Sequence, residues 1–517
     1  MPWTSKRLSK YLYLREMKRY IRLGWLIVAA ILSQSSIGTS QEYLFDYSPR
    51  VKEVYRDIID LRVTSAHAKL QAYSQQEPYN LAYLHMESYL NFFQLFISEE
   101  YPLYSTYKDK KNKILKGLDQ LGDKDPYKRY AIAEVKLQSA LIRAKFDEVI
   151  GGSREMYAAY KLLKDNQEKY PDFIYNKKSL SIIHSMIETI SFPGILKKIL
   201  GIEGSLDTGL QEIEALIAWS QANPDFIFQE EIDAIYLYIL AYLANDQSRV
   251  EEYLPQARFQ PSQSALSTFM VSKFQQRAGH NEAALSTLRN RPNADDQEAF
   301  PYLDLQEGIC LLRKGDAIAG HHIEAFLSTF KGRHYIKEAH QKLAWSALLF
   351  DNDLVDYKQH MSKVESSGYL VVDADIQAWR EAKQSQTPDP LLLRARLLYD
   401  GGYYHQAMTL LVREGYRYKG DQQDNLEYQY RLGRIFQALK NYPEAILYCN
   451  ATMTQDKKGN TYYACNAALQ IGLIHEEQGQ WSKAKKYFEL CLKMKPNTYQ
   501  RSLHQKAKSG LQRIKAK

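Results

Sequence analysis

Residues 465–498 read CNAALQIGLIHEEQGQWSKAKKYFELCLKMKPNT, and this stretch decides the fold class. Apolar residues recur at helical spacing on both sides of Gly479, and Pro496 ends the second run. This spacing predicts two helices joined by a tight turn. Gly472 and Ala484 fall where the helices would cross, and small residues there let two backbones approach closely. The stretch therefore predicts a helical hairpin.

The same pattern occurs twice more upstream, at spacings of 38 and 39 residues. Each copy has a small residue on the first helix, an aromatic residue in the turn and an alanine on the second helix. We expect the turn aromatic to fill the wedge between neighbouring hairpins. The equivalent positions are Ala395, Gly433 and Gly472 for the small residue, Tyr404, Tyr442 and Trp481 for the aromatic, and Ala407, Ala445 and Ala484 for the alanine, with Phe488 and Pro496 completing the last copy.

The rest of the chain shows the same helical-hairpin pattern in a weaker form. Apolar residues follow helical spacing, with Gly, Pro or Asp/Asn breaks every fifteen to twenty residues and almost no alternation of period two. A short segment, PDFIY at 171–175, recurs as PDFIF at 224–228. Paired short helices with brief connections are typical of a helical-hairpin solenoid. We therefore expect an all-α chain.

The three C-terminal segments resemble tetratricopeptide repeats, whose helix A, turn and helix B carry small residues at the eighth and twentieth positions. The units are 388–421, 426–459 and 465–498, with a period four or five residues above the 34 of the family. We interpret 41–255 as divergent hairpins, 256–387 as degenerate repeats and 499–517 as a basic capping helix whose charged side faces solvent. The resemblance implies a right-handed α-α superhelix.

The resemblance also implies a non-catalytic scaffold whose concave face, formed by first helices, binds a peptide or a partner protein. Plain solvent exposure is the alternative for each residue on that face. The subclass that clamps a C-terminal carboxylate is not favoured, because Leu469 and Leu473 occupy two of the corresponding positions. The first-helix residues expected to face the groove are Arg396, Tyr430, Arg434, Gln437, Asn466 and Glu476.

Catalytic and metal-binding patterns are absent from the sequence. There is no Gly-x-Ser-x-Gly, His-Glu-x-x-His or Gly-Lys-Ser/Thr motif, and the four cysteines form no Cys-x-x-Cys pair. We expect no enzyme, no cofactor and no metal site, and we interpret acidic runs such as Glu230-Glu231 and Glu476-Glu477 as solvated helix faces. Whether two of Cys449, Cys465 and Cys491 form a disulfide stays open.

The net charge of +8 lies at the two ends of the chain. Residues 1–40 hold seven Lys/Arg and one acid, residues 482–517 hold eleven and one, and 41–481 are left with −8. Because the C-terminal basic cluster lacks interleaved aromatics and a known binding motif, we expect no nucleic-acid partner. The alternative for the C-terminal cluster is a patch that binds an anionic surface.

The N-terminus has the residue pattern of a secretory signal peptide. Basic residues precede the eight-residue apolar run 25–32, which is too short to span a bilayer and is followed by small and polar residues. We expect cleavage near Ser40, translation starting at Met17, and a periplasmic protein of a bacterial envelope that is soluble or peripheral to a membrane. The alternative is an uncleaved N-terminal anchor.

A second hypothesis is an envelope protein that binds a carbohydrate or another small ligand on a helical-repeat frame. The chain has 40 tyrosines, and exposed pairs such as Tyr403-Tyr404 and Tyr462-Tyr463 would offer stacking faces for sugars. A continuous groove with exposed Arg and Tyr would favour peptide binding, whereas a closed, aromatic-lined pocket would favour a ligand.

Overall fold

The computed structural model describes residues 42–189, 203–292, 297–384, 386–418, 422–456, 459 and 461–515. Every regular element within these ranges is a helix, apart from one isolated β-bridge between Leu44 and Asn80. Successive helices pack against each other in pairs along the chain. The expected all-α, helical-hairpin solenoid is therefore confirmed, while the proposed signal segment 1–40 lies outside the described residues.

The N-terminal part of the solenoid runs from α2 to α12. Side-chain caps start several of its helices: Ser48 accepts a hydrogen bond from the Val51 amide, and Asp125 accepts one from the Tyr127 amide. The helices are α2 (Pro49–Ile59), α3 (Val63–Gln76), α4 (Ala82–Ser98), α5 (Tyr101–Leu118), α6 (Pro126–Lys145), α7 (Val149–Lys169), α8 (Asn176–Thr189), α10 (Leu206–Ala222), α11 (Gln229–Tyr238), the π-helix η1 (Ile239–Ala244), α12 (Gln247–Tyr253) and the short η2 (Leu254–Gln256).

The two copies of the PDFI segment form the turns before α8 and α11, and their aromatic residues meet in one core. The ring centroids of Tyr175 and Phe226 are 5.2 Å apart, and those of Phe226 and Phe228 are 5.8 Å apart. Phe228 is fully buried. The repeated segment thus stacks one hairpin on the next through aromatic contacts.

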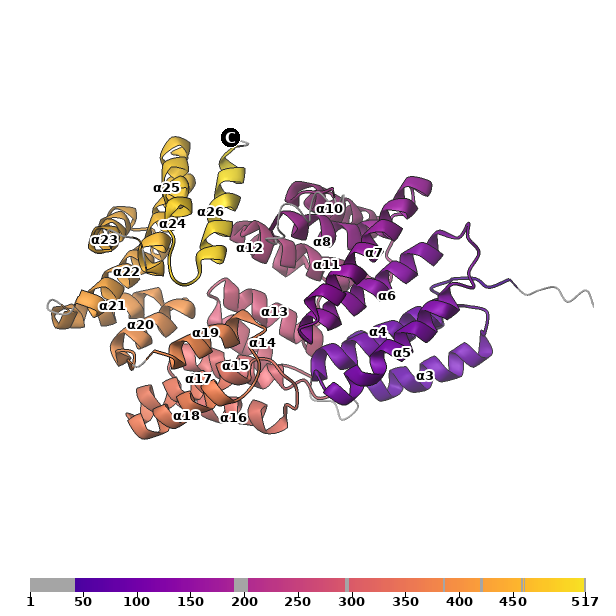
Figure 1. Ribbon diagram of the computed structural model, residues 1–517, viewed down its shortest axis with the longest axis horizontal. Helices are drawn as coiled ribbons and strands as arrows, with labels where there is room; N and C mark the ends of the chain where they lie inside the picture. The colour runs from indigo at the N-terminus through magenta and orange to yellow at the C-terminus, as the bar shows by residue number, and fades with distance from the viewer. Residues whose placement is uncertain are drawn as a thin grey trace, which may run out of the picture.

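The middle part follows at the lower centre of Figure 1. A buried carboxylate, Glu99 at the end of α4, joins it to the N-terminal part by accepting hydrogen bonds from the amides of Arg333 and His334, both at 2.9 Å. The helices are α13 (Ala265–Arg277), α14 (Asn281–Arg289), α15 (Tyr302–Lys314), α16 (Ala319–Thr329), α17 (Ile336–Ser346), the π-helix η3 (Ala347–Asp351), α18 (Leu354–Ser366) and α19 (Asp373–Ala382).

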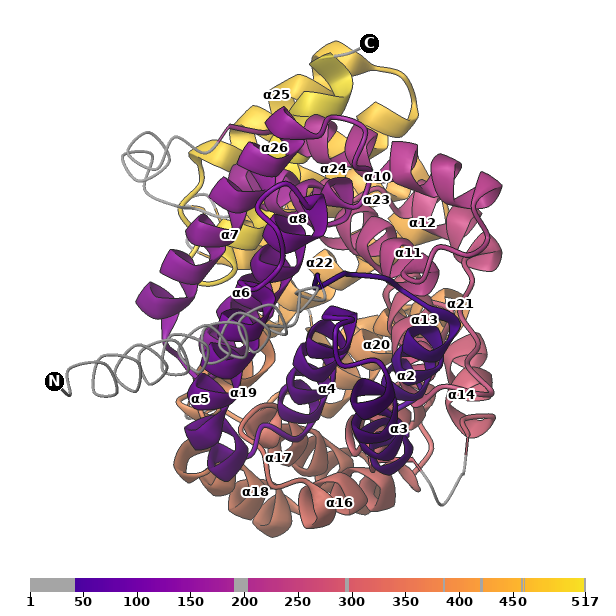
Figure 2. The same ribbon diagram turned by 90° about the vertical axis from the view of Figure 1, so that its right-hand side faces the viewer.

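The C-terminal part contains the three hairpins quoted from the sequence and lies at the end of the long axis opposite α3 and α5 (Figure 1). In the view along that axis, α25 and α26 are at the top and α16 and α18 at the bottom (Figure 2). The helices are α20 (Pro390–Asp400), α21 (Tyr404–Glu414), η4 (Gly415–Tyr418), α22 (Gln422–Ala438), α23 (Tyr442–Gln455), α24 (Tyr462–Glu477), α25 (Trp481–Lys493) and α26 (Gln500–Lys515).

Small residues lie where the paired helices cross. A Cβ added to Gly472 would lie 2.6 Å from the Phe488 ring, and one added to Gly433 would lie 2.9 Å from the Cys449 Sγ. Pro496 is buried just beyond α25. The crossing alanines, all fully buried, are Ala395, Ala407, Ala445 and Ala484.

The three turn aromatics are the first residues of α21, α23 and α25 rather than turn residues. Tyr404 and Tyr442 are half-buried. Trp481 is 38% exposed and covers Gly479 of its own turn, so it does not fill a wedge between hairpins. The expected packing role is wrong for this tryptophan, because its ring lies over its own turn and is partly exposed.

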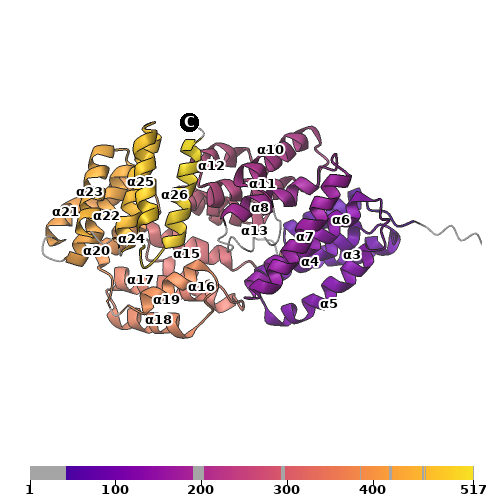
Figure 3. The same ribbon diagram turned by 45° about the horizontal axis from the view of Figure 1, so that its top comes forward.

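Helix α26 connects the C-terminal part of the solenoid to the end of its N-terminal part. It packs on α24 and α25, and its other side lies next to α12 in Figures 1 and 3. Arg513 Nη1 donates to the carbonyl of Ala244 at 3.1 Å and also pairs with Glu476. The expectation of a cap with a solvent-facing basic side is therefore wrong in part, because the curvature of the solenoid brings η1 against that side.

Two further expectations concern cysteines and membranes. All four cysteines are free and buried, and the Sγ atoms of Cys465 and Cys491 lie 3.5 Å apart. Among the described residues, no helix has the length and apolar character needed to cross a bilayer.

Candidate functional site

The solenoid contains a run of connected hollows. Neighbouring hollows share lining residues, so they form one continuous groove. Lys273 and Glu338 line both an apolar hollow and a small hollow beside it. Arg396 and Asp400 line that small hollow and also a third, cationic hollow. The groove changes from apolar near α4 and α13 to cationic near α22 and α26. We call this whole run the groove.

The cationic hollow has a volume of about 250 Å³ and lies between α20, α22, α24 and α26. Four of the six residues expected on the concave face line it, namely Arg396, Tyr430, Arg434 and Asn466. The sequence did not indicate Lys506 of α26, which also lines it. First helices thus face the groove here, and α26 covers part of it.

Arg434 lies deep in the cationic hollow without a carboxylate partner. Its Nη1 donates to the Tyr430 hydroxyl at 2.9 Å and its Nη2 to the Tyr399 hydroxyl at 2.8 Å. The Nε is buried and has no acceptor in the described part of the chain. A guanidinium held only by neutral groups leaves positive charge uncompensated.

Lys506 adds a second uncompensated cation. Burial, together with the nearby charges of Arg277 and Arg434, lowers its pKa to about 8. It forms no ion pair with any described residue. An anion placed here would relieve this repulsion.

The neighbouring polar hollow, of about 590 Å³, extends the groove past α19 and α24. Two of its charged groups satisfy each other: Arg431 pairs with Glu427, which also accepts a hydrogen bond from the Tyr463 hydroxyl at 2.7 Å. Tyr462 lines both hollows, and its ring centroid is 4.2 Å from that of Tyr463. Such a lining suits a polar chain that passes over it.

The other two predicted groove residues do not line these hollows. Glu476 pairs with Arg513 of α26 at 2.7 Å, so its expected roles as a partner contact and as a solvated helix residue are both wrong. Gln437 is half-buried and outside the linings of the hollows. The stacking pair proposed for sugars is also partly engaged, since the Tyr403 hydroxyl donates to Glu282 at 2.7 Å.

The apolar end of the groove is a cavity of about 740 Å³ between α2, α4, α11, α13 and α15. We call it the aromatic cavity. Its rings come from both the N-terminal and the middle parts of the chain, which is why no local pattern in the sequence indicated it. Prominent lining residues are Phe92, Phe96, Phe269, Met270, Phe300 and Tyr302.

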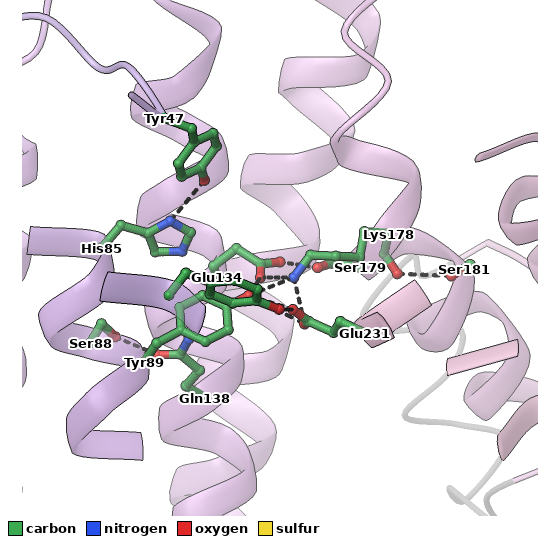
Figure 4. Close-up of polar contacts among 11 residues, drawn as sticks. Tyr47, His85, Ser88, Tyr89, Glu134, Gln138, Lys178, Ser179, Ser181 and Glu231 are labelled. Atoms are coloured by element: carbon green, nitrogen blue, oxygen red, sulfur yellow. Dashed lines mark hydrogen bonds and ion pairs between the residues drawn. The ribbon is translucent and has the colours of Figure 1, made fainter. Parts of the chain in front are cut away.

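Beside the aromatic cavity lies a buried charge network (Figure 4). Lys178 Nζ donates to Glu134 at 2.5 Å, to Glu231 at 2.6 Å and to the Tyr89 hydroxyl at 2.7 Å. Burial raises the pKa of Glu231. Burial would also raise the pKa of Glu134, but the charge of Lys178 outweighs it and the pKa is lowered. The expectation that Glu231 is solvated is wrong, because α11 packs it against α8.

This network joins four helices, α4, α6, α8 and α11. Lys178 is 1% exposed, so the amine is closed to a substrate, and we assign the network a structural role in fixing the wall of the aromatic cavity. Among the described residues, no group of His, Cys, Asp and Glu has the arrangement of a metal site.

The geometry defines a class, the helical-repeat solenoid proteins. Within it, residues 466–498 match the family model of the tetratricopeptide repeat, which is the segment α24–α25. No curated protein matches the chain. The similarity favours a role in protein–protein interaction.

Proposed function

We propose that the chain is a non-catalytic scaffold that binds an acidic segment of a partner protein in the cationic part of the groove. The observation that carries this proposal is the pair Arg434 and Lys506, two cations in the hollow that form no ion pair with any described residue. The one carboxylate in the lining, Asp400, pairs with Arg396 instead. The similarity to a repeat family whose concave face binds peptides supports it.

The chemistry of recognition follows from the same two residues. A carboxylate in the hollow would accept from the Arg434 Nε, which is otherwise unsatisfied, and from the Lys506 amine. Charge-assisted hydrogen bonds of this kind are each worth about 1.5 to 3 kcal/mol. The polar hollow next to it would accommodate flanking peptide.

The test measures binding of two fluorescein-labelled octapeptides, one alternating Glu and Gly and one alternating Gln and Gly, by fluorescence anisotropy. We expect the acidic peptide to bind more tightly and to lose affinity as salt rises. Arg434→Gln and Lys506→Gln should each weaken acidic-peptide binding about tenfold, since one charge-assisted contact is lost.

Lys508→Gln is the matched control, because Lys508 lies on the same helix but is exposed. It should leave binding unchanged, and circular dichroism should show equal helix content in all variants. Equal affinity for the two peptides, or equal losses in Lys506→Gln and Lys508→Gln, would contradict the proposal.

We also propose that the protein is exported and held in a bacterial envelope, on the strength of the basic and apolar N-terminal segment. Mass spectrometry of the intact protein from cell fractions tests this. A periplasmic chain that begins near Gln41 would support export and cleavage, and a full-length chain in the cytoplasmic fraction would refute both.

A further inference from the structure

The aromatic cavity lies at the other end of the groove from the proposed peptide site and has a chemistry of its own. A volume of about 740 Å³ with a mainly apolar, aromatic lining falls in the range of pockets that bury small organic ligands. Phe92 and Phe96 of α4 line it together with Phe269 and Met270 of α13. Apolar surface of this extent is stabilised when another apolar group covers it.

Many polar groups in the cavity wall are already engaged. The Tyr302 hydroxyl donates to Glu99, Ser267 Oγ donates to Glu230 at 2.9 Å, and Ser264 Oγ donates to the Ile59 carbonyl at 2.9 Å. A peptide backbone entering here would bury amides and carbonyls with few partners, at a cost of about 1 to 3 kcal/mol for each group. A hydrocarbon chain has no such groups, so the wall favours hydrocarbon.

Lys273 marks the polar end of the cavity. Its Nζ donates to Gln306 Oε1 at 3.3 Å and forms no ion pair within the described ranges. Burial lowers its pKa, and the charge of Glu338 offsets this only in part, because Glu338 lies beyond ion-pair distance and leaves the amine without a close counter-ion. A carboxylate beside it would supply that counter-ion.

The small hollow next to the aromatic cavity has further cationic side chains. Lys273 lines both it and the aromatic cavity, and Arg313, Lys342 and Arg396 lie further along. Three carboxylates of the cavity wall have cations of their own, since Glu230 pairs with Arg56, Glu231 with Lys178 and Glu338 with Lys342. A fourth lining carboxylate, Asp373, is exposed to solvent. The unmatched charge at the inner end of the cavity is therefore positive.

We propose that the aromatic cavity binds a free long-chain carboxylic acid, with its chain among the aromatic rings and its carboxylate at Lys273. The site is separate from the acidic-peptide site, and it corresponds to the aromatic-lined pocket that favours a small ligand. The chain would then combine a peptide-binding repeat scaffold with a separate pocket for a small ligand.

The test titrates the full chain with myristate, tetradecanol and methyl myristate below their aggregation concentrations, by isothermal titration calorimetry. We expect myristate to bind at one site and about tenfold more tightly than the two neutral analogues. Lys273→Met should remove this preference, so that all three bind alike. Lys363→Met, which changes an exposed lysine of α18, should leave the preference intact.

Two cavity-filling variants test the location of the chain. Ala234→Phe and Met270→Phe place a ring inside the cavity, and each should weaken binding of all three ligands at least tenfold. Ala283→Phe, on the exposed side of α14, should not. Having two filling variants keeps the test decisive if one of them fails to fold, as judged by circular dichroism.

The proposal is overturned if the unaltered protein does not bind myristate, if Lys273→Met keeps the tenfold preference for the carboxylate, or if a folded filling variant binds as before. Tighter binding of methyl myristate than of myristate would also overturn it, because it would show that an esterified chain is the preferred form. Arg434→Gln should leave myristate binding unchanged, which separates this result from the peptide test.

Discussion

Replacing Glu99 by Gln should loosen the joint between the N-terminal and middle parts of the solenoid. The Glu99 side chain is fully buried and accepts hydrogen bonds from Lys145, from the Tyr302 hydroxyl, from His334 and from two backbone amides. Glu99→Gln keeps the shape but removes the charge, leaving the Lys145 amine without its counter-ion.

The size of the effect follows from the pKa of Glu99. Burial alone would raise it, but the hydrogen bond from His334 and the charge of Lys145 lower it to about 2 from an ordinary value of 4.5. At about 1.4 kcal/mol for each pH unit, this difference contributes about 3 kcal/mol to stability. Removing one partner of a buried ion pair typically costs about 3 to 5 kcal/mol, which agrees.

The pH dependence has a definite sign. Because the pKa of Glu99 is lower in the folded chain than in the unfolded one, the contribution is complete above pH 4.5 and is lost as pH falls toward 2. The stability difference between the unaltered protein and Glu99→Gln should therefore shrink from about 3 kcal/mol at neutral pH to almost nothing near pH 2.

Urea unfolding followed by circular dichroism measures this difference. At pH 7, Glu99→Gln should unfold at lower urea, with a separate early transition for one part of the chain. Glu168→Gln, a change of an exposed glutamate on α7, serves as control and should unfold like the unaltered protein. The reasoning is refuted if the two variants unfold alike at pH 7, or if their difference persists undiminished in acid.

Three further predictions concern the C-terminal part. Gly472→Val should lower the free energy of unfolding by about 1 to 3 kcal/mol in urea titrations, because its Cβ would press on the buried Phe488 ring; an unchanged midpoint would contradict the close crossing. All four cysteines should react with a thiol reagent only after unfolding, and a count of two would reveal a disulfide. Lys506, with its pKa of about 8, should be acetylated at lower pH than the exposed Lys508, as peptide mass spectrometry would show, and equal labelling would contradict its buried setting.

The fold class was predictable because it depends on local information. Helical spacing, Gly472 at a crossing and Pro496 after a helix each act within one hairpin, and the hairpin repeats. The first-helix residues Arg396, Tyr430, Arg434 and Asn466 were placed by the same logic, since one face of helix A must line the concave side.

The aromatic cavity and the Glu99 joint were not predictable, because their members are far apart in sequence. Glu99 meets His334 across 235 residues, and Phe92 meets Phe269 only once α4 and α13 are brought together. Phenylalanines at helical spacing fit an ordinary core equally well. Only the curvature of the assembled solenoid decides which rings pack and which line a cavity.

Lys506 shows why a polar helix face cannot be assigned to solvent from its sequence alone. On an isolated amphipathic helix the basic side points to water, which gave the expectation for α26. In the solenoid, Arg513 on that helix reaches the carbonyl of Ala244 across 269 residues, and Lys506 lines the hollow beside Arg434. The contact that closes the array is therefore also the one that places a cation in the groove, so the docking of α26 and the charge of the peptide site depend on each other.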